Sequence, residues 1–336
     1  MLAAMGEFDL IARYFTRPAR RAALGVGDDC ALLQPAPGTQ LAVSSDMLVE
    51  GRHFFADVDP AALGHKALAV NLSDLAACGA RPLAFTLALA LPRVDEAWLA
   101  GFSGGLLALA DAHGCELVGG DTTQGPLNIC ITVFGEVPVA NGRSQALLRS
   151  GARAGDALYV SGTLGDARLA LDALLGRIEL PAGLLAPARQ RLERPTPRVA
   201  LGQALRGVAS AALDVSDGLL GDLRHILKKS GVGATVDADA ASNLIAARAD
   251  CASAGGLFDA QIAPAQWRAW ALAGGDDYEL LFTAPASARA RVAEAARASQ
   301  TPVTRIGTID PEPGLRVVDR QGLALPGNYA SFDHFA

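Results

Sequence analysis

The chain has 336 residues, a length typical of two domains of ordinary size. Apolar residues make up 51% of it and charged residues 19%, a composition that excludes intrinsic disorder. The net charge is −6 and only Lys66, Lys228 and Lys229 are lysines, so we expect no broad basic surface and no nucleic-acid partner.

Cysteine usage and apolar runs indicate a soluble chain in a reducing compartment. The five cysteines are odd in number and form no C-x-x-C pair, which argues against a disulfide framework or a thiolate zinc site. The first residues lack the basic segment and apolar run of a signal peptide. The longest uncharged apolar run, residues 83–91, is too short to span a bilayer. We therefore expect a cytoplasmic protein without membrane contact.

The first half of the chain alternates strand and helix patterns. Apolar runs predict strands over residues 40–44, 83–91, 116–118 and 128–137. Helical spacing of apolar residues, with Pro60 at one start and glycines at both ends, predicts helices over residues 60–78 and 96–113. This β-α-β-α-β order predicts an N-terminal α/β domain over residues 1–150.

A polar, turn-rich segment at residues 149–156 marks a domain boundary. Beyond it the patterns predict strands over residues 157–161, 211–216 and 234–238, helices over residues 167–175 and 218–229, and a turn leading into a strand over residues 274–283. The predicted fold class is therefore α/β (α+β), with two mixed α/β domains, the second over residues 151–336.

Short turns rich in Gly, Ser and Asp recur next to apolar strands. The segments are LGVGDDCALL, LAVSSDMLVE, CELVGGDTTQG, AALDVSDGLLGDL and LAGGDDYELLF, and Asp74 in a predicted helix joins them. One such turn alone is explained by local backbone chemistry. Six acidic segments, most of them after buried strands, favour a ligand site at the carboxyl ends of strands. Because the carboxylates would repel one another without cations, the pattern predicts several Mg²⁺ ions holding a polyphosphate.

Other nucleotide and catalytic motifs are missing from the sequence. There is no G-x-x-x-x-G-K-[ST], the dinucleotide fingerprint after Gly25 is incomplete, and there are no protein-kinase, H-E-x-x-H or G-x-S-x-G signatures. No His, Ser or Cys has an evident activating base at motif spacing, which favours direct phosphoryl transfer without a phosphoenzyme. His53 follows Glu50 by three residues, and this spacing leaves a functional and a structural role both open.

The motifs, taken together, resemble the thiamine-monophosphate kinase family, which belongs to the wider superfamily of aminoimidazole ribonucleotide synthetase-like ATP-binding proteins. The resemblance rests on GEFDLIARYF, VGDDCALL, AVSSDMLVEGRHF, KALAVNLSDLAACGARP, VGGDTTQGP, LRSGARAGD, LDVSDGL, GGDDYELLF and FDHF, in the family's order from residue 6 to residue 335. It implies a homodimer in which both N-terminal domains form an interface β-barrel, with the C-terminal α/β domain packing against it.

The resemblance also implies an activity and a site: transfer of a phosphate from ATP to thiamine monophosphate, giving ADP and thiamine diphosphate. It places Mg²⁺ on Asp29, Ser44, Ser45, Asp46, Asp74, Asp121, Asp214 and Asp217. It places ATP on Gly120, Asp121, Arg149 and Ser216, and thiamine monophosphate on His53, Asp276 and Phe332. Within this set we expect Asp46, Asp74 and Asp121 to be needed for turnover. Positioning and charge neutralisation dominate phosphoryl transfer, and with so few lysines the metals must supply most of the positive charge.

Two alternatives remain open at the level of sequence. One is another synthetase of the same superfamily, similar to aminoimidazole ribonucleotide synthetase, although the GGDDYEL and FDHF segments argue against it. The other is a catalytically silent module that binds Mg-nucleotide; the complete set of mutually repelling carboxylates argues against that. The family usually has Glu where this chain has Asp276, which leaves open whether Asp276 contacts substrate directly or through water.

Overall fold

The computed structural model describes residues 6–248, 262–326 and 329. Contacts divide the chain into two compact units: residues 1–75 with 80–145, and residues 76–79 with 146–336. We call them the N-terminal and C-terminal units. Among the described residues, no helix combines the length and the apolar character needed to cross a membrane.

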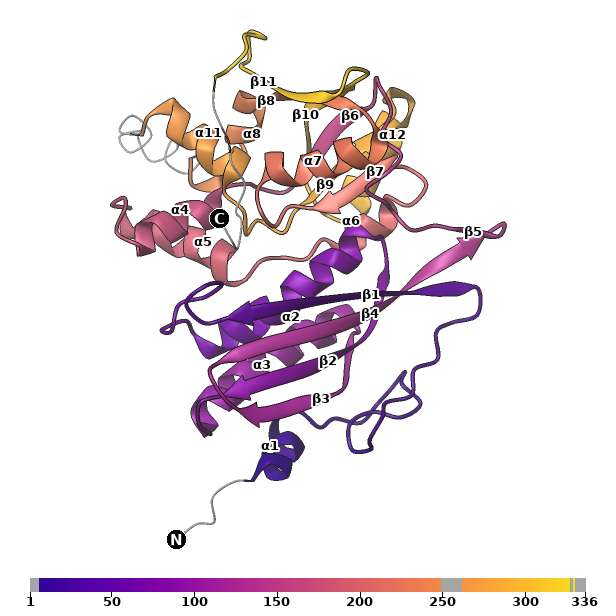
Figure 1. Ribbon diagram of the computed structural model, residues 1–336, viewed down its shortest axis with the longest axis vertical. Helices are drawn as coiled ribbons and strands as arrows, with labels where there is room; N and C mark the ends of the chain where they lie inside the picture. Colours follow the sequence, from indigo (N-terminus) through magenta and orange to yellow (C-terminus); the bar gives the residue numbers. More distant parts are fainter. Residues whose placement is uncertain (1–5, 249–261, 327–328, 330–336) are drawn as a thin grey trace. The chain divides into compact units, whose positions relative to one another are not determined.

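The N-terminal unit is built on a five-stranded mixed sheet. The strand order is β1-β4-β2-β3, with the short β5 on the far end of β4; β2 and β3 are parallel and the other pairs are antiparallel (Figure 1). Its elements are α1 (Glu7–Tyr14), β1 (Thr39–Val49), α2 (Pro60–Ala77), β2 (Arg81–Leu91), α3 (Glu96–His113), β3 (Glu116–Gln124), β4 (Asn128–Ala140) and β5 (Arg143–Ser144). The predicted helices and the β-α-β-α-β order are confirmed.

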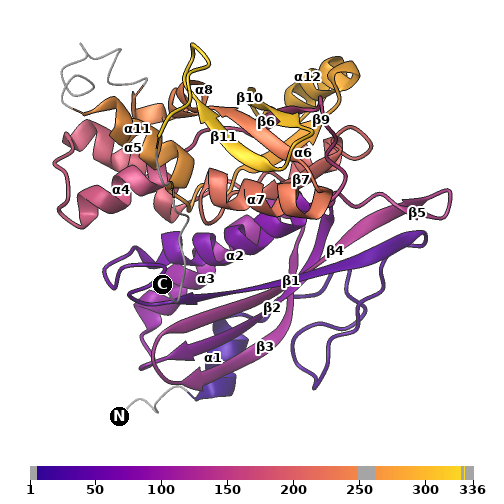
Figure 2. The ribbon, with the colours of Figure 1, turned by 45° about the horizontal axis from the view of Figure 1, so that its top comes forward.

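Helices α2 and α3 cover one face of this sheet, while α1 lies beside the edge strand β3 (Figures 1 and 2). The two covering helices approach each other closely at two glycines. A Cβ atom on Gly64 would lie 2.0 Å from the carbonyl oxygen of Phe102, and one on Gly105 would lie 1.9 Å from that of Ala61. Because neither position has room for a side chain, both helices can bury nearly their whole inner surface.

Two of the predicted acidic turns of this unit are instead inside strands. Ser44, Ser45 and Asp46 lie in the middle of the eleven-residue β1, and Asp121 lies within β3. The prediction that these motifs follow strand ends is therefore wrong. Strand β1 pairs with β4 over its whole length, which keeps the motif in an extended conformation. Because β1 is an edge strand, alternate backbone groups point away from β4, and that of Asp46 is satisfied by the Asn71 side chain of α2.

The C-terminal unit has a six-stranded sheet of order β11-β8-β10-β6-β9-β7, in which only β11 and β8 are a parallel pair. The elements are β6 (Ala157–Ser161), α4 (Asp166–Leu174), α5 (Ala182–Glu193), α6 (Val199–Ala204), β7 (Ala211–Asp214), α7 (Leu219–Ser230), β8 (Gly233–Asp237), α8 (Ala238–Ser242), α11 (Pro264–Ala273), β9 (Leu280–Ala284), the 3₁₀ turn η1 (Ala286–Ala288), α12 (Arg289–Ala298), β10 (Val303–Asp310) and β11 (Gly314–Val318). Here the predicted strands at β6, β7 and β8 are confirmed.

The core of the C-terminal unit lies between its sheet and helices α4, α7, α8 and α11. Helix α11 packs on α7, α8 and α4, and places Trp267 and Trp270 in the interior, each 1% exposed. Their rings meet edge to face, with centroids 5.1 Å apart. This packing fixes the two loops that carry the acidic motifs of the unit, the one after β7 and the one before β9.

Candidate functional site

Strand β1 and helix α2 bring three of the predicted metal ligands to one face of the N-terminal sheet. Ser44 and Asp46 are two residues apart on β1, so their side chains lie on the same face of the sheet, the face toward α2. The Ser44 hydroxyl donates a hydrogen bond to Asp74 of α2, with 2.5 Å between Oγ and Oδ2. The backbone N–H of Asp46 donates to Oδ1 of Asn71, one helical turn before Asp74, at 3.0 Å. These contacts hold hydroxyl and carboxylate oxygens together, the ligands that Mg²⁺ prefers.

Asn71 is a part of this group that the sequence analysis missed. It is 1% exposed, and its amide donates to the carbonyl oxygen of Ala67 while its oxygen accepts from Asp46. A spacing of three residues places it on the same helical face as Asp74. That spacing within KALAVNLSDL is the signal that could have identified it.

Ser45 points to the opposite face of the sheet from Ser44. Its hydroxyl lies 3.0 Å from Oγ1 of Thr132, donates to the carbonyl oxygen of Ile131 at 3.1 Å, and lies 3.7 Å from the Cys130 sulfur. The two serines of the S-S-D motif therefore cannot act on one ion through their side chains, as the period of two along a strand requires.

Asp121 lies apart from the group around Asp46. Across the sheet Asp46 is in register with Ile131, Leu87 and Gly120, so Asp121 belongs to the next row, with its side chain on the other face. Three strand spacings of roughly 4.8 Å separate β1, which carries Asp46, from β3, which carries Asp121, a distance of about 14 Å. Within one chain, Asp46 and Asp121 cannot bind the same ion.

Gly120 precedes Asp121 at a point where β3 approaches β2 very closely. Its φ is 147°, and a Cβ atom there would lie 1.8 Å from the carbonyl oxygen of Leu87. Only glycine fits this position without a shift of the backbone. The glycine therefore allows β3 to pair closely with β2 immediately before Asp121.

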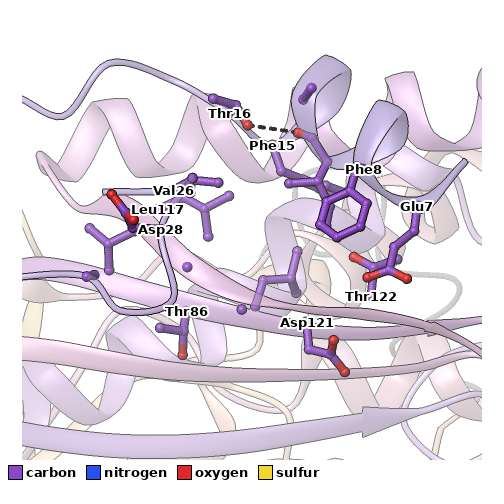
Figure 3. Close-up of a pocket in the computed structure, with 18 of the residues that line it drawn as sticks. Glu7, Phe8, Phe15, Thr16, Val26, Asp28, Thr86, Leu117, Asp121 and Thr122 are labelled. Carbon is purple, nitrogen blue, oxygen red and sulfur yellow. Dashed lines mark hydrogen bonds between the residues drawn. The ribbon is translucent and has the colours of Figure 1, made fainter. Parts of the chain in front are cut away.

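A cavity of about 750 Å³ lies at this end of β3 and joins it to the loop before β1 and to α1. Figure 3 shows Glu7 and Phe8 of α1 on one side and Val26 and Asp28 of the loop on the other. Its lining includes four acidic residues, Glu7, Asp28, Asp29 and Asp121. Its apolar wall comes from Phe8 and Ile11 of α1 and from Phe15, which directly follows this helix. The lining of this one cavity thus includes Asp29, Gly120 and Asp121, three of the residues that the family resemblance assigns to metal or nucleotide.

His53 lies in the turn after β1. Its Nδ1 accepts the backbone N–H of Val49 at 3.0 Å, so the neutral ring carries its proton on Nε2. The Lys66 ammonium donates to the backbone carbonyl of the same residue at 3.4 Å. These contacts fix the orientation of the imidazole. Phe332, another predicted substrate residue, lies outside the described residues.

The C-terminal unit brings together two loops that carry Asp214, Ser216, Asp217 and Asp276. Asp214 ends β7, and the loop Val215–Gly218 follows it. The backbone N–H of Asp276 donates to the carbonyl oxygen of Ser216, and that of Tyr278 to Val215, both at 2.8 Å. These bonds hold the loop before β9 against the loop after β7. The expectation that the LDVSDGL motif forms a turn at the end of a strand is confirmed.

Two residues of the loop before β9 adopt the left-handed backbone region that favours glycine. The φ of Asp276 is 59° and that of Tyr278 is 50°. Such conformations are uncommon for Asp and strained for a bulky Tyr, and they concentrate at functional sites. The half-buried Asp276 and Tyr278 alternate with the buried Asp277 and Glu279, which anchor the loop.

The anchor is an ionic cluster that the sequence analysis did not foresee. The fully buried carboxylate of Glu279 accepts from Arg198 at 2.5 and 2.6 Å, from Arg191 at 2.9 Å and from the Ser161 hydroxyl at 2.6 Å. A buried carboxylate with several donors, among them two arginines, is compensated in a way that an unpaired one is not. The arginines come from α5 and the segment before α6, so no local sequence pattern could reveal the pairing.

Asp222, the fourth residue of α7, supports the loop after β7. Its Oδ2 atom accepts the backbone N–H groups of Ser216 at 3.0 Å and Asp217 at 3.1 Å. Burial, together with the nearby Asp217 carboxylate, raises the pKa of Asp222 to about 7. A carboxyl group of α7 thus supports the loop that carries Ser216 and Asp217.

Arg149 lies at the other end of β7 from Ser216. The carbonyl oxygen of Leu148 accepts the N–H of Ala212, and that of Arg149 accepts the Ser230 hydroxyl at 3.3 Å, at the end of α7. The Arg149 side chain is exposed. Both predicted ATP contacts therefore border the same strand, but a ligand that touches both must extend along it.

The donor chemistry of these groups fits Mg²⁺. The predicted ligands are carboxylate and hydroxyl oxygens without sulfur or imidazole, as a hard cation requires. They fall into three groups, around Asp74, around Asp121 and around Asp217. Within the part of the chain that the structure describes, no three His, Cys, Asp or Glu side chains converge into a preformed metal cage. Phosphate oxygens would have to complete the coordination, which is usual for Mg²⁺.

Comparison with known proteins first defines the class of this chain. Residues 27–137 match the AIR synthase related protein, N-terminal domain, and residues 153–320 match the AIR synthase related protein, C-terminal domain. The chain is therefore a two-domain α/β protein of the AIR synthase related class. HypE, a hydrogenase maturation protein of Escherichia coli, shares the fold at 22% identity, with a TM-score of 0.72 over 96% of both chains.

Closer relatives define the family. The chain is 47% identical to thiamine-monophosphate kinase of Salmonella typhimurium, over 99% of both chains. It is 45% identical to the crystal structure of thiamine-monophosphate kinase from Stenotrophomonas maltophilia, with a TM-score of 0.80 over 94% of this chain and 95% of that one. It is 29% identical to AaThiL, solved in complex with AMPPCP and TMP, with a TM-score of 0.72 over 90% and 89% of the two chains. The chain belongs to the thiamine-monophosphate kinase family.

Proposed function

We propose that this chain transfers the terminal phosphate of ATP to thiamine monophosphate and releases ADP and thiamine diphosphate. The observation that carries the proposal is the 47% identity over 99% of both chains to a thiamine-monophosphate kinase. The aligned region spans both units, so it covers the segments that carry the acidic motifs. The AaThiL relative binds AMPPCP and TMP together, the pair of ligands that such a reaction requires.

The cavity between α1, the loop before β1 and β3 is the part of the N-terminal unit best suited to the nucleotide. Gly120 is exposed and lines this cavity, where its backbone could meet a phosphate chain, while Phe8, which is 82% exposed, offers an apolar face to a base. Ser216 and Arg149 would add contacts from the C-terminal unit, and the Arg149 guanidinium would supply a forked, charged contact to phosphate. In this proposal residues 1–150 form the ATP and metal domain, and residues 151–336 complete the active site.

Several Mg²⁺ ions would neutralise the charge on the phosphates during the transfer. The residues that would hold them are the predicted set: Asp29, Ser44, Ser45, Asp46, Asp74, Asp121, Asp214 and Asp217. Among the described residues, Ser44 orients the Asp74 carboxylate, and Asn71 fixes the backbone of Asp46. These contacts support a role for the group in placing oxygen ligands rather than in donating or accepting a proton.

Thiamine monophosphate would be held by His53, Asp276 and Phe332. The fixed Nε2–H of His53 is suited to donate to a phosphate oxygen, and the Asp276 carboxylate is suited to accept from an aminopyrimidine, directly or through water. The terminal phosphate of thiamine monophosphate would attack the γ-phosphorus of ATP in line, and the bond to the β-phosphate oxygen would break. A chain without an activated nucleophile needs no phosphoenzyme for this step.

A homodimer would cover the exposed apolar face of the N-terminal sheet. Leu41, Val43 and Met47 alternate along β1 on the face away from α2 and are 44%, 57% and 52% exposed. A soluble monomer seldom leaves such a contiguous apolar row uncovered. The sheet of a second copy, packed on the same face in a closed two-fold arrangement, would form the interface barrel that the family resemblance implies.

Turnover measured with and without thiamine monophosphate tests the proposal. We expect ADP and thiamine diphosphate to form in equal amounts when ATP, Mg²⁺ and thiamine monophosphate are all present. Incubation with γ-labelled ATP alone should leave no labelled protein. A silent nucleotide-binding module would bind Mg-ATP and release no ADP, and another synthetase of the class would leave thiamine monophosphate unconverted. Either of these results would reject the proposed reaction.

A further inference from the structure

Asp222 holds two successive backbone N–H groups with a single oxygen atom. Its Oδ2 accepts from Ser216 at 3.0 Å and from Asp217 at 3.1 Å, and its own N–H donates to the carbonyl oxygen of Gly218. Two adjacent N–H groups that converge on one acceptor leave the peptide planes between them little freedom to rotate. The side chain therefore fixes the conformation of the turn that follows β7.

The placement of this carboxyl group is costly if stability alone is considered. Asp222 is 6% exposed, and no arginine or lysine of the described residues forms an ion pair with it. The carboxylate of Asp217 stands close enough to repel it. Burial of an acidic group without a cation is unfavourable, and a neutral capping residue would stabilise the start of α7 without this cost.

The turn that Asp222 fixes is also the support for the loop before β9. The carbonyl oxygen of Ser216 accepts the N–H of Asp276, and a Cβ atom on Gly275 would lie 2.7 Å from that same oxygen. A rotation of the Ser216 peptide would break this hydrogen bond, and the short Cβ distance shows that Gly275 packs directly against the same oxygen. The position of the turn therefore also sets the position of Asp276.

We propose that Asp222 is a positioning residue: it orients the backbone of Ser216 and Asp217 so that both can meet a magnesium-bound nucleotide. This inference rests on the proposed function, in which those two residues contact ATP and its ions. Asp222 itself lies beneath the turn and acts through it. Loss of the two hydrogen bonds should weaken nucleotide binding even when the chain stays folded.

Binding of AMPPCP in the presence of Mg²⁺, measured by calorimetry, tests the inference on the full chain without catalysis. We expect Asp222→Ala to weaken binding about tenfold or more, because two donors lose their acceptor. Asp222→Asn should stay within about threefold of the wild type, since one amide oxygen can accept both N–H groups. Asp222→Leu, which has a similar shape and suits a buried site, should weaken binding as Asp222→Ala does and serves if that variant fails to fold.

Asp237 offers a matched control in the same unit. Its Oδ1 accepts the N–H groups of Asp239 at 3.0 Å and Ala240 at 2.9 Å, the same pattern of one oxygen and two donors. It ends β8, which lies four places from β7 in the sheet. Asp237→Ala should lower the melting temperature and leave the affinity for AMPPCP unchanged.

Three results would overturn the inference. Unchanged affinity in Asp222→Ala or Asp222→Leu would mean that the turn keeps its shape without the carboxyl group. Equal losses in Asp222→Asn and Asp222→Ala would mean that the charge matters and the hydrogen bonds do not. Equal losses in Asp237→Ala and Asp222→Ala would indicate a general loss of stability. If the wild type itself bound no AMPPCP, the proposed nucleotide site would fail, a result distinct from the other three.

Discussion

The backbone N–H of Asp276 donates to the carbonyl oxygen of Ser216 at 2.8 Å, and this bond joins the two loops that carry the acidic motifs of the C-terminal unit. Ser216 is assigned to ATP in the proposed function and Asp276 to thiamine monophosphate. A single hydrogen bond thus links the residues expected to contact the two substrates. The Asp276 side chain can be changed while this backbone link is kept.

Replacement of Asp276 should affect thiamine monophosphate more than ATP. Asp276→Ala removes the carboxylate and should raise the KM for thiamine monophosphate roughly ten- to a hundredfold, because a donor on the bound ligand loses its acceptor. The KM for ATP should change little. Steady-state kinetics with each substrate varied in turn measures the split. A change confined to the KM for ATP or to the Mg²⁺ requirement would place Asp276 in the metal site instead.

Two further substitutions separate the contact from the backbone strain at this residue. Ala tolerates the φ of 59° less well than Asp, so Asp276→Ala should also lose about 1 kcal/mol of unfolding free energy. Asp276→Asn keeps both the size and the tolerance of that conformation, so any rise in its KM for thiamine monophosphate reflects the carboxylate alone. Asp276→Glu should retain most of the activity.

Asp46, Asp74 and Asp121 should each be needed for turnover. Replacement by Asn keeps the shape and removes a negative charge, and we expect kcat to fall roughly a hundredfold or more, as for other groups that stabilise charge in the transition state. Folding should survive, since the Ser44 hydroxyl can still donate to the Asn oxygen at position 74. Near-normal activity of all three variants at low Mg²⁺ would contradict the assignment.

The sequence was informative where the chemistry is local. The helices α2, α3 and α7 were predicted from apolar spacing and end residues, and the turn after β7 from its Ser-Asp-Gly chemistry. The same turn chemistry misled for β1 and β3, because β1 pairs with β4 and β3 with β2 through the residues of these motifs. Pairing between distant segments cannot be read from a window of ten residues.

Contacts between residues far apart in the sequence account for the features that were not predicted. Arg198 and Glu279 are 81 positions apart, and Ser161 and Glu279 are 118 apart. The cavity beside Asp121 likewise combines α1 with β3. The separation of Asp46 from Asp121 follows from the strand order β1-β4-β2-β3, which no motif encodes.

Asp277 should make the stability of the chain depend on pH. Its Oδ1 accepts the N–H of Gly165 at 2.8 Å, whereas its buried Oδ2 has no hydrogen-bond partner. Burial raises the pKa of Asp277 well above its ordinary value. The folded chain therefore holds a proton that the unfolded chain releases near pH 4, so the unfolding free energy falls as pH rises from there through the folded pKa.

Thermal unfolding of Asp277→Asn against the wild type measures this contribution. Asn is neutral at every pH and its oxygen can still accept from Gly165. The melting temperature of the variant should rise relative to that of the wild type as pH increases from 5 to 8. Parallel curves for the two proteins over that range would show that Asp277 does not titrate differently in the folded chain.

The apolar face of β1 should mediate dimerisation. Light scattering at micromolar concentration should give about twice the chain mass for the wild type, as a closed two-fold pair requires. Val43→Arg places a charge in the centre of the proposed interface and should give monomers. Val94→Arg is a matched control, because Val94 is 48% exposed and lies in the segment between β2 and α3. Monomers in the wild type, or dimers in Val43→Arg, would contradict the proposed interface.

Mixed dimers can show whether Asp46 and Asp121 act within one chain or across two. In one chain they lie about 14 Å apart on opposite faces of the sheet, too far to share an ion. If each proposed site combines Asp46 of one copy with Asp121 of the other, a dimer of one Asp46→Asn and one Asp121→Asn chain contains one intact site and one doubly substituted site. We expect co-expressed, doubly tagged mixed dimers to recover about half the wild-type kcat while both parent homodimers stay inactive, a fraction set by counting sites in a two-fold assembly.

Mixed dimers of Asp46→Asn with Asp74→Asn, two residues that lie on one side of the same chain, should remain inactive because every site then carries a substitution. Activity as low in the first mixture as in the second would show that each site is built from the two carboxylates of a single chain.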